Sequence, residues 1–338
     1  MKKLLSVILC FLMLLSVISL AGCGGSKETL KLGFGVHSYI EEIKNADGEN
    51  NGSGEATTTV AAVLLDKDGK IVKCEIDTAA NAIAFTANGA FVKVGELKTK
   101  YEAGKDYNMV AYGGAKKEWF EQADAFESVV IGKNLEEVKA LKVDGNKGND
   151  EVVNAGCTII ISDFIIAIEK AVNNAVDSKA TADDTLQLGI VSSQAYDSKD
   201  ATDEANGVNE IDTTMVAVAL DKDGVITAAA TDSVVTTIEF DTKGVSKTEY
   251  GVVINSKKAT GKDYGMAQYG NDLNGDGTVK EWYEQADVFS AELVGKKQSD
   301  IAGLANDKGY GSDALQTAGC TINVNDMVKA AAKAATVK

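Results

Sequence analysis

The sequence repeats itself once along its 338 residues. Segments of the first half recur in the same order in the second half, with a period of about 160 residues. The recurring pairs are Leu32-Gly33 and Leu188-Gly189, Thr57 to Gly69 and Asp212 to Gly224, Gly104 to Tyr107 and Gly261 to Tyr264, Lys117 to Asp124 and Lys280 to Asp287, and Ala155 to Ile159 and Ala318 to Ile322. This period is far longer than that of solenoid repeats, and it matches the length of a whole domain with its own core. We therefore expect two domains of one type, at residues 32–175 and 186–338, joined by a polar linker at 176–185.

The composition excludes several classes of protein. The 34 basic residues are all Lys, and they stand against 50 Asp and Glu, which gives a formal net charge of −16. We expect no nucleic-acid partner, because no basic surface is available to displace counterions from phosphates. The single His, His37, argues against His-rich metal sites and against a Ser-His-Asp hydrolase.

The N-terminus has the pattern of an export signal. Met1-Lys2-Lys3 is positively charged, and residues 4–20 are almost entirely apolar, close to the lower length limit of a membrane-spanning helix. Leu20-Ala21-Gly22-Cys23 resembles the lipobox of bacterial lipoproteins, which implies cleavage before Cys23 and lipidation of that residue. Two palmitate-like acyl chains suffice for stable anchoring. We expect a signal peptide at 1–22, a lipidated tether at 23–31, and a lipid-anchored protein at the extracellular face of the cell membrane, in contact with the lipid bilayer.

Three cysteines remain beyond the anchor: Cys74, Cys157 and Cys320. Their number is odd, and their spacing fits neither a zinc ribbon nor a redox pair. No neighbouring Lys and no Arg is present to activate them. We expect buried thiols that act as small apolar side chains.

Each half predicts strands followed by helices, which favours an α+β fold with a small antiparallel sheet and packed helices in each domain. Turn chemistry at Asp66 to Gly69 predicts a hairpin between residues 57–65 and 70–77, and residues 83–85 and 238–240 suggest a third strand. Amphipathic helices are expected at 118–130, 162–176, 281–294 and 325–335. Plausible N-caps of the C-terminal helices are Ser162 or Asp163 and Asn325 or Asp326.

The repeated Ala-Gly-Cys-Thr-Ile segment stands just before the last helix of each half. A phosphate would be favoured there, because backbone N–H groups are unpaired at a helix N-terminus and the helix dipole is positive. A Thr hydroxyl at this point can be esterified to a phosphate, and a preceding Gly lets the backbone come close. A buried strand-to-helix turn, in which Cys fills core volume, explains the same residues.

The stretch from Ala318 to Ala331 resembles the end of the FMN-binding domain family. That family carries a Ser-Gly-Ala-Thr motif followed by a helix, and its FMN is esterified through the phosphate to the motif Thr. The resemblance covers both halves and implies two covalent FMN groups, although Ala replaces the motif Ser and Cys replaces the motif Ala. The residues that it places at the cofactor are Thr158, Thr321, Gly156, Gly319, Cys157 and Cys320.

Other candidate residues follow from the repeat or from a single insertion. Trp119 and Trp282 recur and can either stack on a flavin ring or lie in the core. Asp272, Asn274 and Asp276, in an insertion of the second half, have the spacing of an EF-hand loop without its final Glu and suggest a weak calcium site or a simple turn. His37 is taken as incidental, because Ser193 stands at the matching place.

Two classes of function remain. Tandem lipid-anchored members of the resembled family imply an extracellular electron carrier rather than a substrate-converting enzyme. Its partners would be a flavin transferase, a membrane redox donor and an extracellular acceptor, and the cofactor would supply the redox chemistry. The alternative is a non-redox surface lipoprotein with a solute-binding, adhesive or structural role.

Overall fold

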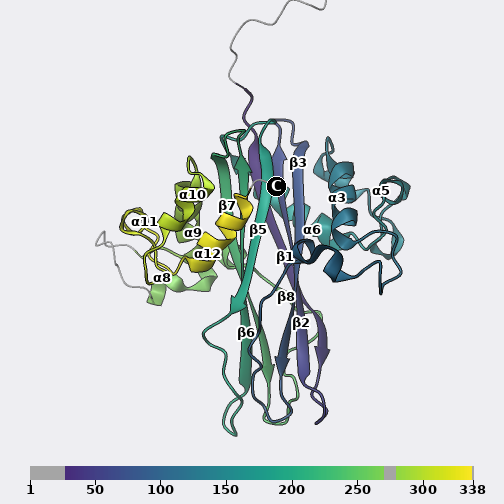
Figure 1. The fold of residues 1–338 in the computed structure, drawn as a ribbon, viewed down its shortest axis with the longest axis vertical. Coiled ribbons are helices and arrows are strands. Elements are labelled where there is room, and N and C mark those ends of the chain that lie inside the picture. The colour runs from purple at the N-terminus through teal and green to yellow at the C-terminus, as the bar shows by residue number, and fades with distance from the viewer. Residues whose placement is uncertain (1–26, 270–278, 337–338) are drawn as a thin grey trace, which may run out of the picture.

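The computed structural model describes residues 27–269 and 279–336. They form an α+β fold with antiparallel sheets, as the sequence predicts. The first sheet has the order β3-β2-β1-β4, with β8 also paired to β1, and the second has the order β5-β6-β7. The strands are β1 (Lys31–Lys44), β2 (Gly52–Leu65), β3 (Ile71–Phe85), β4 (Val176–Asp177), β5 (Thr185–Gln194), β6 (Gly207–Leu220), β7 (Ile226–Phe240) and β8 (Val253–Ile254). Long strands therefore run the full height of the molecule (Figure 1).

The predicted hairpin is confirmed. The Asp66 side chain accepts hydrogen bonds from the backbone N–H groups of Asp68 and Lys70, at 2.9 and 2.8 Å. Gly69 has φ +75°, a conformation that a side chain would strain. Asp221 makes the equivalent bonds in the second half, to Asp223 and Val225. The turn chemistry thus joins β2 to β3 and β6 to β7.

Two strand predictions are wrong. Residues 83–85 and 238–240 are not separate third strands, because β3 and β7 each continue without interruption over 15 residues. The real third strands are β1 and β5, which precede the hairpins and pair with β2 and β6. Glycines interrupt the apolar alternation of β1 and hide it from a periodicity argument.

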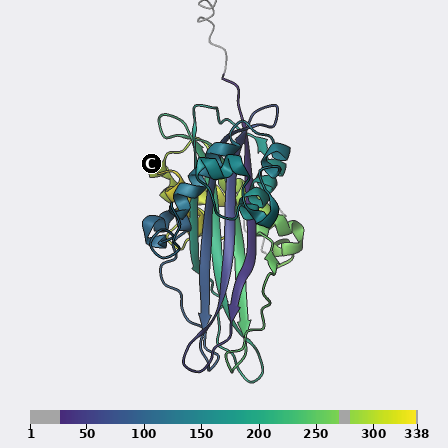
Figure 2. The same ribbon diagram turned by 90° about the vertical axis from the view of Figure 1, so that its right-hand side faces the viewer.

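The two sheets face each other, and a shared apolar core fills the space between them (Figures 1 and 2). One part of this core brings together inner side chains of both halves, such as Phe34 and Val60 with Ile190 and Met215. Where β3 and β7 end, the rings of Phe85 and Phe240 stack with centroids 4.7 Å apart. Each half contributes one wall, so the halves are joined by an extensive apolar contact.

Each half also carries a lobe of helices on the outer face of its own sheet (Figure 1). The first lobe contains α2 (Lys100–Ala103), α3 (Trp119–Val130), α4 (Leu135–Lys139), α5 (Asp150–Ala155) and α6 (Ser162–Asn173). The second contains α7 (Lys257–Thr260), α8 (Met266–Tyr269), α9 (Trp282–Leu293), α10 (Gln298–Ile301), α11 (Asp313–Thr317) and α12 (Asn325–Ala334). Short 3-10 turns are η1 (Gly104–Tyr107), η2 (Asp144–Asn146), η3 (Gly261–Tyr264) and η4 (Ala302–Leu304). The four predicted helices appear as α3, α6, α9 and α12.

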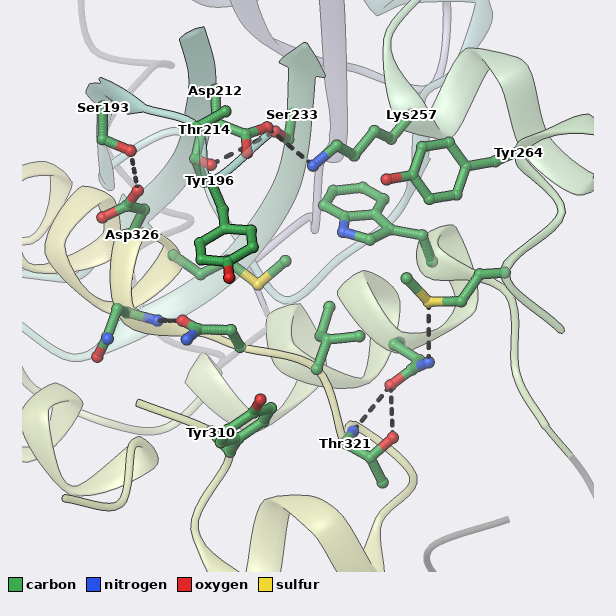
Figure 3. A pocket seen from close by; sticks show the side chains of 18 of the residues that line it. Ser193, Tyr196, Asp212, Thr214, Ser233, Lys257, Tyr264, Tyr310, Thr321 and Asp326 are labelled. Atoms are coloured by element: carbon green, nitrogen blue, oxygen red, sulfur yellow. Dashed lines mark hydrogen bonds and ion pairs between the residues drawn. The ribbon is translucent and has the colours of Figure 1, made fainter. Parts of the chain in front are cut away.

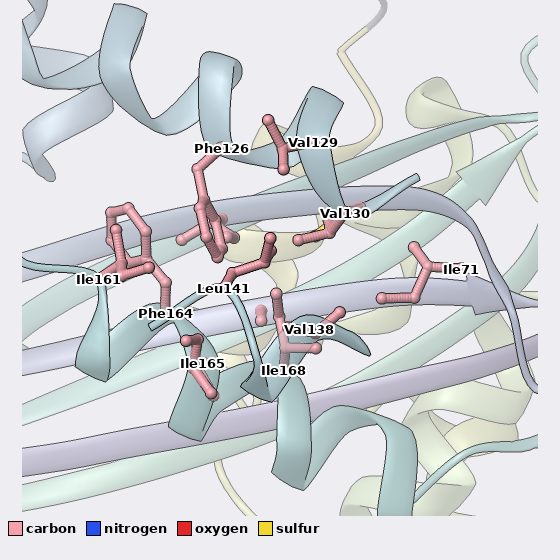
Figure 4. Close-up of a cluster of buried hydrophobic side chains, with 14 of the residues drawn as sticks. Ile71, Phe126, Val129, Val130, Val138, Leu141, Ile161, Phe164, Ile165 and Ile168 are labelled. Carbon is pink, nitrogen blue, oxygen red and sulfur yellow. The ribbon is translucent and has the colours of Figure 1, made fainter. Parts of the chain in front are cut away.

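Each lobe has a core of its own against the outer face of the sheet. In the first lobe, Phe126 and Val130 of α3 meet Phe164 and Ile168 of α6 over the strands (Figure 4). The second lobe has a separate cluster that includes Phe289 of α9. The expected cores of the two halves are therefore present, in addition to the core that the halves share.

The last helix of each half packs closely against a strand at the position of a glycine. A Cβ built on Gly35 would overlap the carbonyl oxygen of Ala167 in α6, and a Cβ built on Gly189 would overlap that of Ala330 in α12. Gly35 is therefore the counterpart of Gly189. The sequence match of Gly33 with Gly189 is wrong by two residues, because helix packing, not the neighbouring Leu, fixes the position of the glycine.

The same shift corrects the match of His37 with Ser193. The Tyr39 hydroxyl donates to Asp163 Oδ2 at 3.0 Å, and the Ser193 hydroxyl donates to Asp326 Oδ2 at 2.6 Å. Tyr39 is thus the counterpart of Ser193. Because Asp163 and Asp326 bind these strand hydroxyls, they do not cap their helices.

The predicted N-caps of α6 and α12 are wrong. The cap positions are Ile161 and Val324, which make no side-chain cap hydrogen bond. The predicted linker, 176–185, is packed against the sheet: its first residues form β4, and the carbonyl of buried Ala180 accepts from Leu30 N–H at 2.8 Å. In the described part of the chain, no helix is both long and apolar enough to cross a bilayer.

Candidate functional site

Thr158 and Thr321 occupy the same loop in the two halves, between the last two helices of each lobe. Gly156 directly follows α5, and Gly319 lies two residues after the end of α11. Their φ angles are +110° and +103°. This backbone conformation favours glycine. Thr158 is exposed and Thr321 is half-buried, so both hydroxyls lie at the surface of the lobe.

A glutamine holds each Thr. Gln122 Oε1 accepts from both the backbone N–H and the hydroxyl of Thr158, at 2.9 and 3.0 Å. Gln285 Oε1 accepts from Thr321 in the same way, at 2.8 and 3.2 Å. Because the hydroxyl proton points to the glutamine, the oxygen lone pairs are left for another partner.

A lysine lies beside each glycine of the loop. Lys117 Nζ stands where a side chain of Gly156 would be, and Lys280 Nζ stands in the same relation to Gly319. Lys280 Nζ donates to the carbonyl of Ala318 at 3.1 Å. The sequence-based expectation that no lysine neighbours the cysteines is wrong, because these lysines come from a segment nearly 40 residues earlier in the chain.

These lysines, rather than free amides, supply the positive charge of the site. The Thr158 N–H is already bonded to Gln122, and the N–H groups of Ile161 and Val324 are bonded to backbone carbonyls. The predicted attraction of a phosphate to unpaired amides therefore does not apply at the Thr residues themselves. The lysine ammonium group lies close to the loop and can attract a phosphate there as a point charge.

The cysteines of the loop are buried apolar groups, as expected. Cys157 and Cys320 have no exposed surface, and the structure contains Cys74 as a third buried free thiol among the described residues. Burial raises the pKa of Cys157 to about 11 and that of Cys320 to about 12, against a smaller opposing effect of Lys117 and Lys280. Both thiols stay protonated at neutral pH.

The two tryptophans lie in the lobe cores. Trp119 is buried and meets Phe164 edge to face, with centroids 5.7 Å apart. Trp282 is also buried, but one side of it lines a cavity, and Lys257 Nζ lies 5.4 Å from its ring centroid. Trp282 therefore combines a place in the lobe core with a border on the cavity.

A cavity of about 990 Å³ lies next to Thr321 in the second half. Figure 3 shows Tyr196, Tyr264 and Tyr310 around it, with Thr321 at its lower edge. Lys257 enters from α7 and pairs with Asp212 of β6, with Nζ 2.9 Å from Oδ1. The cavity therefore combines aromatic walls, two paired cations, Lys257 and Lys329, and the Thr321 hydroxyl.

Sequence reasoning missed Gln122, Gln285, Lys117, Lys280 and Lys257. Four of these stand in the repeated segments Lys117 to Asp124 and Lys280 to Asp287, so their identity in both halves was a usable signal. Lys257 has a counterpart in Lys100, and each lies over a tyrosine ring.

Other predicted site residues are not brought into this site. Cys23 and the calcium candidates Asp272, Asn274 and Asp276 lie outside the described residues. Among residues 27–269 and 279–336, no group of three or more His, Cys, Asp or Glu side chains is placed to hold a metal ion.

In comparisons with known proteins, no family model, no curated protein and no solved structure matches the chain. A cavity of this size is within the range of small-molecule and cofactor sites, and aromatic walls with few polar groups are typical of them. The surroundings of Thr321 thus offer a hydroxyl, a lysine beside the loop and aromatic side chains around the cavity.

Proposed function

We propose that this chain is a membrane-anchored extracellular electron carrier that holds FMN covalently on Thr158 and Thr321. The observation that carries the proposal is the repeated arrangement of Thr, Gln and Lys. In both halves, a buried glutamine fixes the Thr hydroxyl, and a lysine lies at the adjacent glycine. The matching arrangements in the two lobes support a paired chemical role for the two Thr hydroxyls.

The protein's own residues would attach and orient the cofactor. Thr Oγ1 would be joined to the flavin phosphate as an ester, so that the bound group is FMN less one water. Lys117 and Lys280 would face the phosphodiester charge, and the aromatic walls beside Thr321 would contact the ring. When bound, the flavin supplies reversible one- and two-electron chemistry, and the protein sets its orientation and surroundings.

Covalent attachment suits an exported protein, because a freely bound cofactor would be lost by diffusion outside the cell. The proposal includes a lipid anchor at Cys23, a flavin transferase for maturation, a membrane redox donor and an extracellular acceptor. The acidic charge of the chain fits the expectation of no nucleic-acid partner.

Intact-mass measurement tests the proposal. The chain with its export signal is co-expressed with a flavin transferase, and two adducts of FMN less water are expected. Thr158→Ala and Thr321→Ala should each remove one adduct, and the double variant should remove both. A matched control is Thr317→Ala, an exposed Thr four residues before Thr321 whose hydroxyl bonds only to the backbone of its own helix. If the wild-type chain gains no adduct under these conditions, the non-redox alternative of a solute-binding, adhesive or structural lipoprotein replaces the proposal.

A further inference from the structure

The two halves repeat the Thr loop but differ on the sheet beside it. The first sheet presents Tyr39 at the position where the second presents Ser193, and both hydroxyls donate to the first-turn Asp of the last helix. Two residues further along the chain stand Glu41, at an irregularity of β1, and Ala195, directly after the end of β5. In both positions, the side chain in the second half is the smaller one.

In the first half, aromatic side chains occupy this place. The Tyr39 ring packs against His37, with centroids 5.3 Å apart and an interplanar angle of 29°. Burial is the main reason why the pKa of Tyr39 is raised, with Asp163 adding to it, and burial also lowers the pKa of His37. The Tyr39 hydroxyl is fixed 3.0 Å from Asp163, so the ring is held across the space between sheet and helix.

In the second half, the short Ser193 and Ala195 leave that space open, and both line the 990 Å³ cavity. Its rim carries three accessible tyrosines: Tyr196 is 100% exposed, Tyr310 46% and Tyr264 37%. Exposed aromatic side chains gathered round a cavity mark a ligand site more often than single surface residues do.

The cavity also contains a fixed cation. The Lys257 side chain is only 12% exposed, is paired with Asp212, and lies over the rings of Tyr264 and Trp282 at 5.9 and 5.4 Å. In the first half, Thr57 stands at the position of Asp212, and its hydroxyl is bonded to Glu41. The ion pair at the cavity wall is therefore specific to the second half.

We infer that the two sites are inequivalent: the cavity beside Thr321 encloses a planar aromatic ring system, with Lys257 as the cationic donor to its polar edge, whereas Tyr39 closes the corresponding place beside Thr158. The identity of the ring as isoalloxazine rests on the proposed function. One flavin would then be enclosed between aromatic side chains, and the other would lie in solvent.

The first experiment uses the full chain made without a flavin transferase, with riboflavin as the probe. Riboflavin has the ring but no phosphate, so the result is independent of esterification. Wild-type protein should quench riboflavin fluorescence saturably with one site per chain. Ser193→Tyr, which copies the arrangement of Tyr39, should weaken binding by about 10-fold or more by filling the cavity.

Two further variants keep this experiment decisive. Ser193→Ala removes the hydrogen bond to Asp326 without filling the cavity, and it should weaken riboflavin binding much less than Ser193→Tyr does. Ala195→Phe fills the cavity from two residues further along the chain, and it decides the question if Ser193→Tyr does not fold. Absence of saturable binding by wild-type protein, two sites per chain, or unchanged binding by a folded filling variant would each overturn the inference.

The second experiment uses flavinylated protein and iodide quenching of flavin fluorescence. Thr158→Ala, which keeps only the flavin on Thr321, should be quenched several-fold less by iodide than Thr321→Ala. Adding Tyr39→Ser to Thr321→Ala should lower the quenching of the remaining flavin, because the ring can then enter. Equal quenching of the two single-flavin proteins contradicts the inference and leaves the proposed function intact, whereas absence of any adduct contradicts the proposed function alone.

Discussion

Gln122 Oε1 accepts two hydrogen bonds from Thr158, from the backbone N–H at 2.9 Å and from the hydroxyl at 3.0 Å. The other end of the Gln122 amide donates to the carbonyl of Lys117 at 3.0 Å. The glutamine side chain is buried, and it links the start of α3 to the loop before α6. Gln285 makes the same bonds to Thr321 and Lys280. One amide in each half therefore fixes both the loop and the direction of its hydroxyl.

Replacing this amide by an apolar side chain should affect one half at a time. In Gln285→Leu, the Thr321 N–H and the Lys280 carbonyl lose their partner, and stability should fall by about 1–3 kcal/mol. Flavin loading of Thr321 should fall about 10-fold or more, because the hydroxyl is no longer oriented. Thr158 in the same chain serves as the control and should load normally. Peptide-level mass spectrometry measures both sites, and equal loading of the two would contradict the prediction.

The loop cysteines should be inert. With pKa values raised by burial to about 11 and about 12, Cys157 and Cys320 should resist alkylation by iodoacetamide at pH 8 in the folded protein and react in urea. Cys157→Ala and Cys320→Ala should each cost about 1–2 kcal/mol through a small cavity. Flavin loading should persist in the double variant. Loss of flavin from a folded double variant, with both Thr residues intact, would assign the attachment to the thiols instead.

Asp77 should make stability depend on pH. Burial raises the pKa of its carboxyl from 3.8 to about 6, against hydrogen bonds from Thr99, Thr78 and Tyr101. The folded state therefore binds this proton more tightly than the unfolded state. The contribution to stability is fully present below pH 3.8 and is lost as the pH rises through 6.

Asp77→Asn keeps the side-chain oxygen and removes the titration. Between pH 4.5 and 7, wild-type protein should lose about 2 kcal/mol of stability relative to this variant. Urea unfolding at the two pH values measures the difference. Identical changes in the two proteins would show that the Asp77 carboxyl does not titrate in this range.

The close contact of α12 with its strand predicts a strong effect at Gly189. A Cβ at this position overlaps the Ala330 carbonyl, so Gly189→Ala should force α12 away from β5 and lower stability by about 2 kcal/mol or more. Gly303→Ala is the matched control, because nothing lies within 4 Å of its Cβ and its φ is not positive. Thermal unfolding should separate the two variants clearly. A stability of Gly189→Ala equal to that of Gly303→Ala is the contrary result.

The anchor can be tested separately. Cys23→Ala should release the chain into the medium or leave its signal uncleaved, because the lipid is its only proposed strong membrane contact. Cell fractionation with immunodetection measures this, and Cys74→Ala provides a cysteine control within the sheet. A processed variant that stays tightly bound to membranes would contradict the lipoprotein prediction.

The parts of the fold that depend on local chemistry could be predicted from the sequence. The Asp-to-Gly turns specified the hairpins, and apolar periodicity specified α3, α6, α9 and α12. Strand β1 could not be found in this way, because Gly33 and Gly35 interrupt its apolar pattern. These glycines are needed because α6 packs closely against the strand there. The packing of the two sheets against each other could not be predicted either. Apolar residues of β2 face the second sheet, whose strands lie more than 100 residues later in the sequence.

The sequence predicted the position of the candidate site but not the contacts within it. The repeated segment located Thr158 and Thr321, but their glutamines lie 36 residues away in another repeated segment, and only the tertiary structure joins them. The two halves differ at Tyr39 and Ser193, which both donate to the first-turn Asp of the last helix. An alignment that matches Ser193 with His37 cannot show that difference.

The core shared by the two sheets has a consequence for biosynthesis. The inner face of β1 to β3 has no complete partner until the chain has been made as far as Phe240, about 155 residues after Phe85. At typical synthesis rates of about 5–20 residues per second, this interval is roughly 8–30 s. During that time, Phe34, Val60 and their neighbours form an apolar surface that invites aggregation or binding by a chaperone. Early translation products of this chain are therefore its most vulnerable form, even though each lobe has a core of its own.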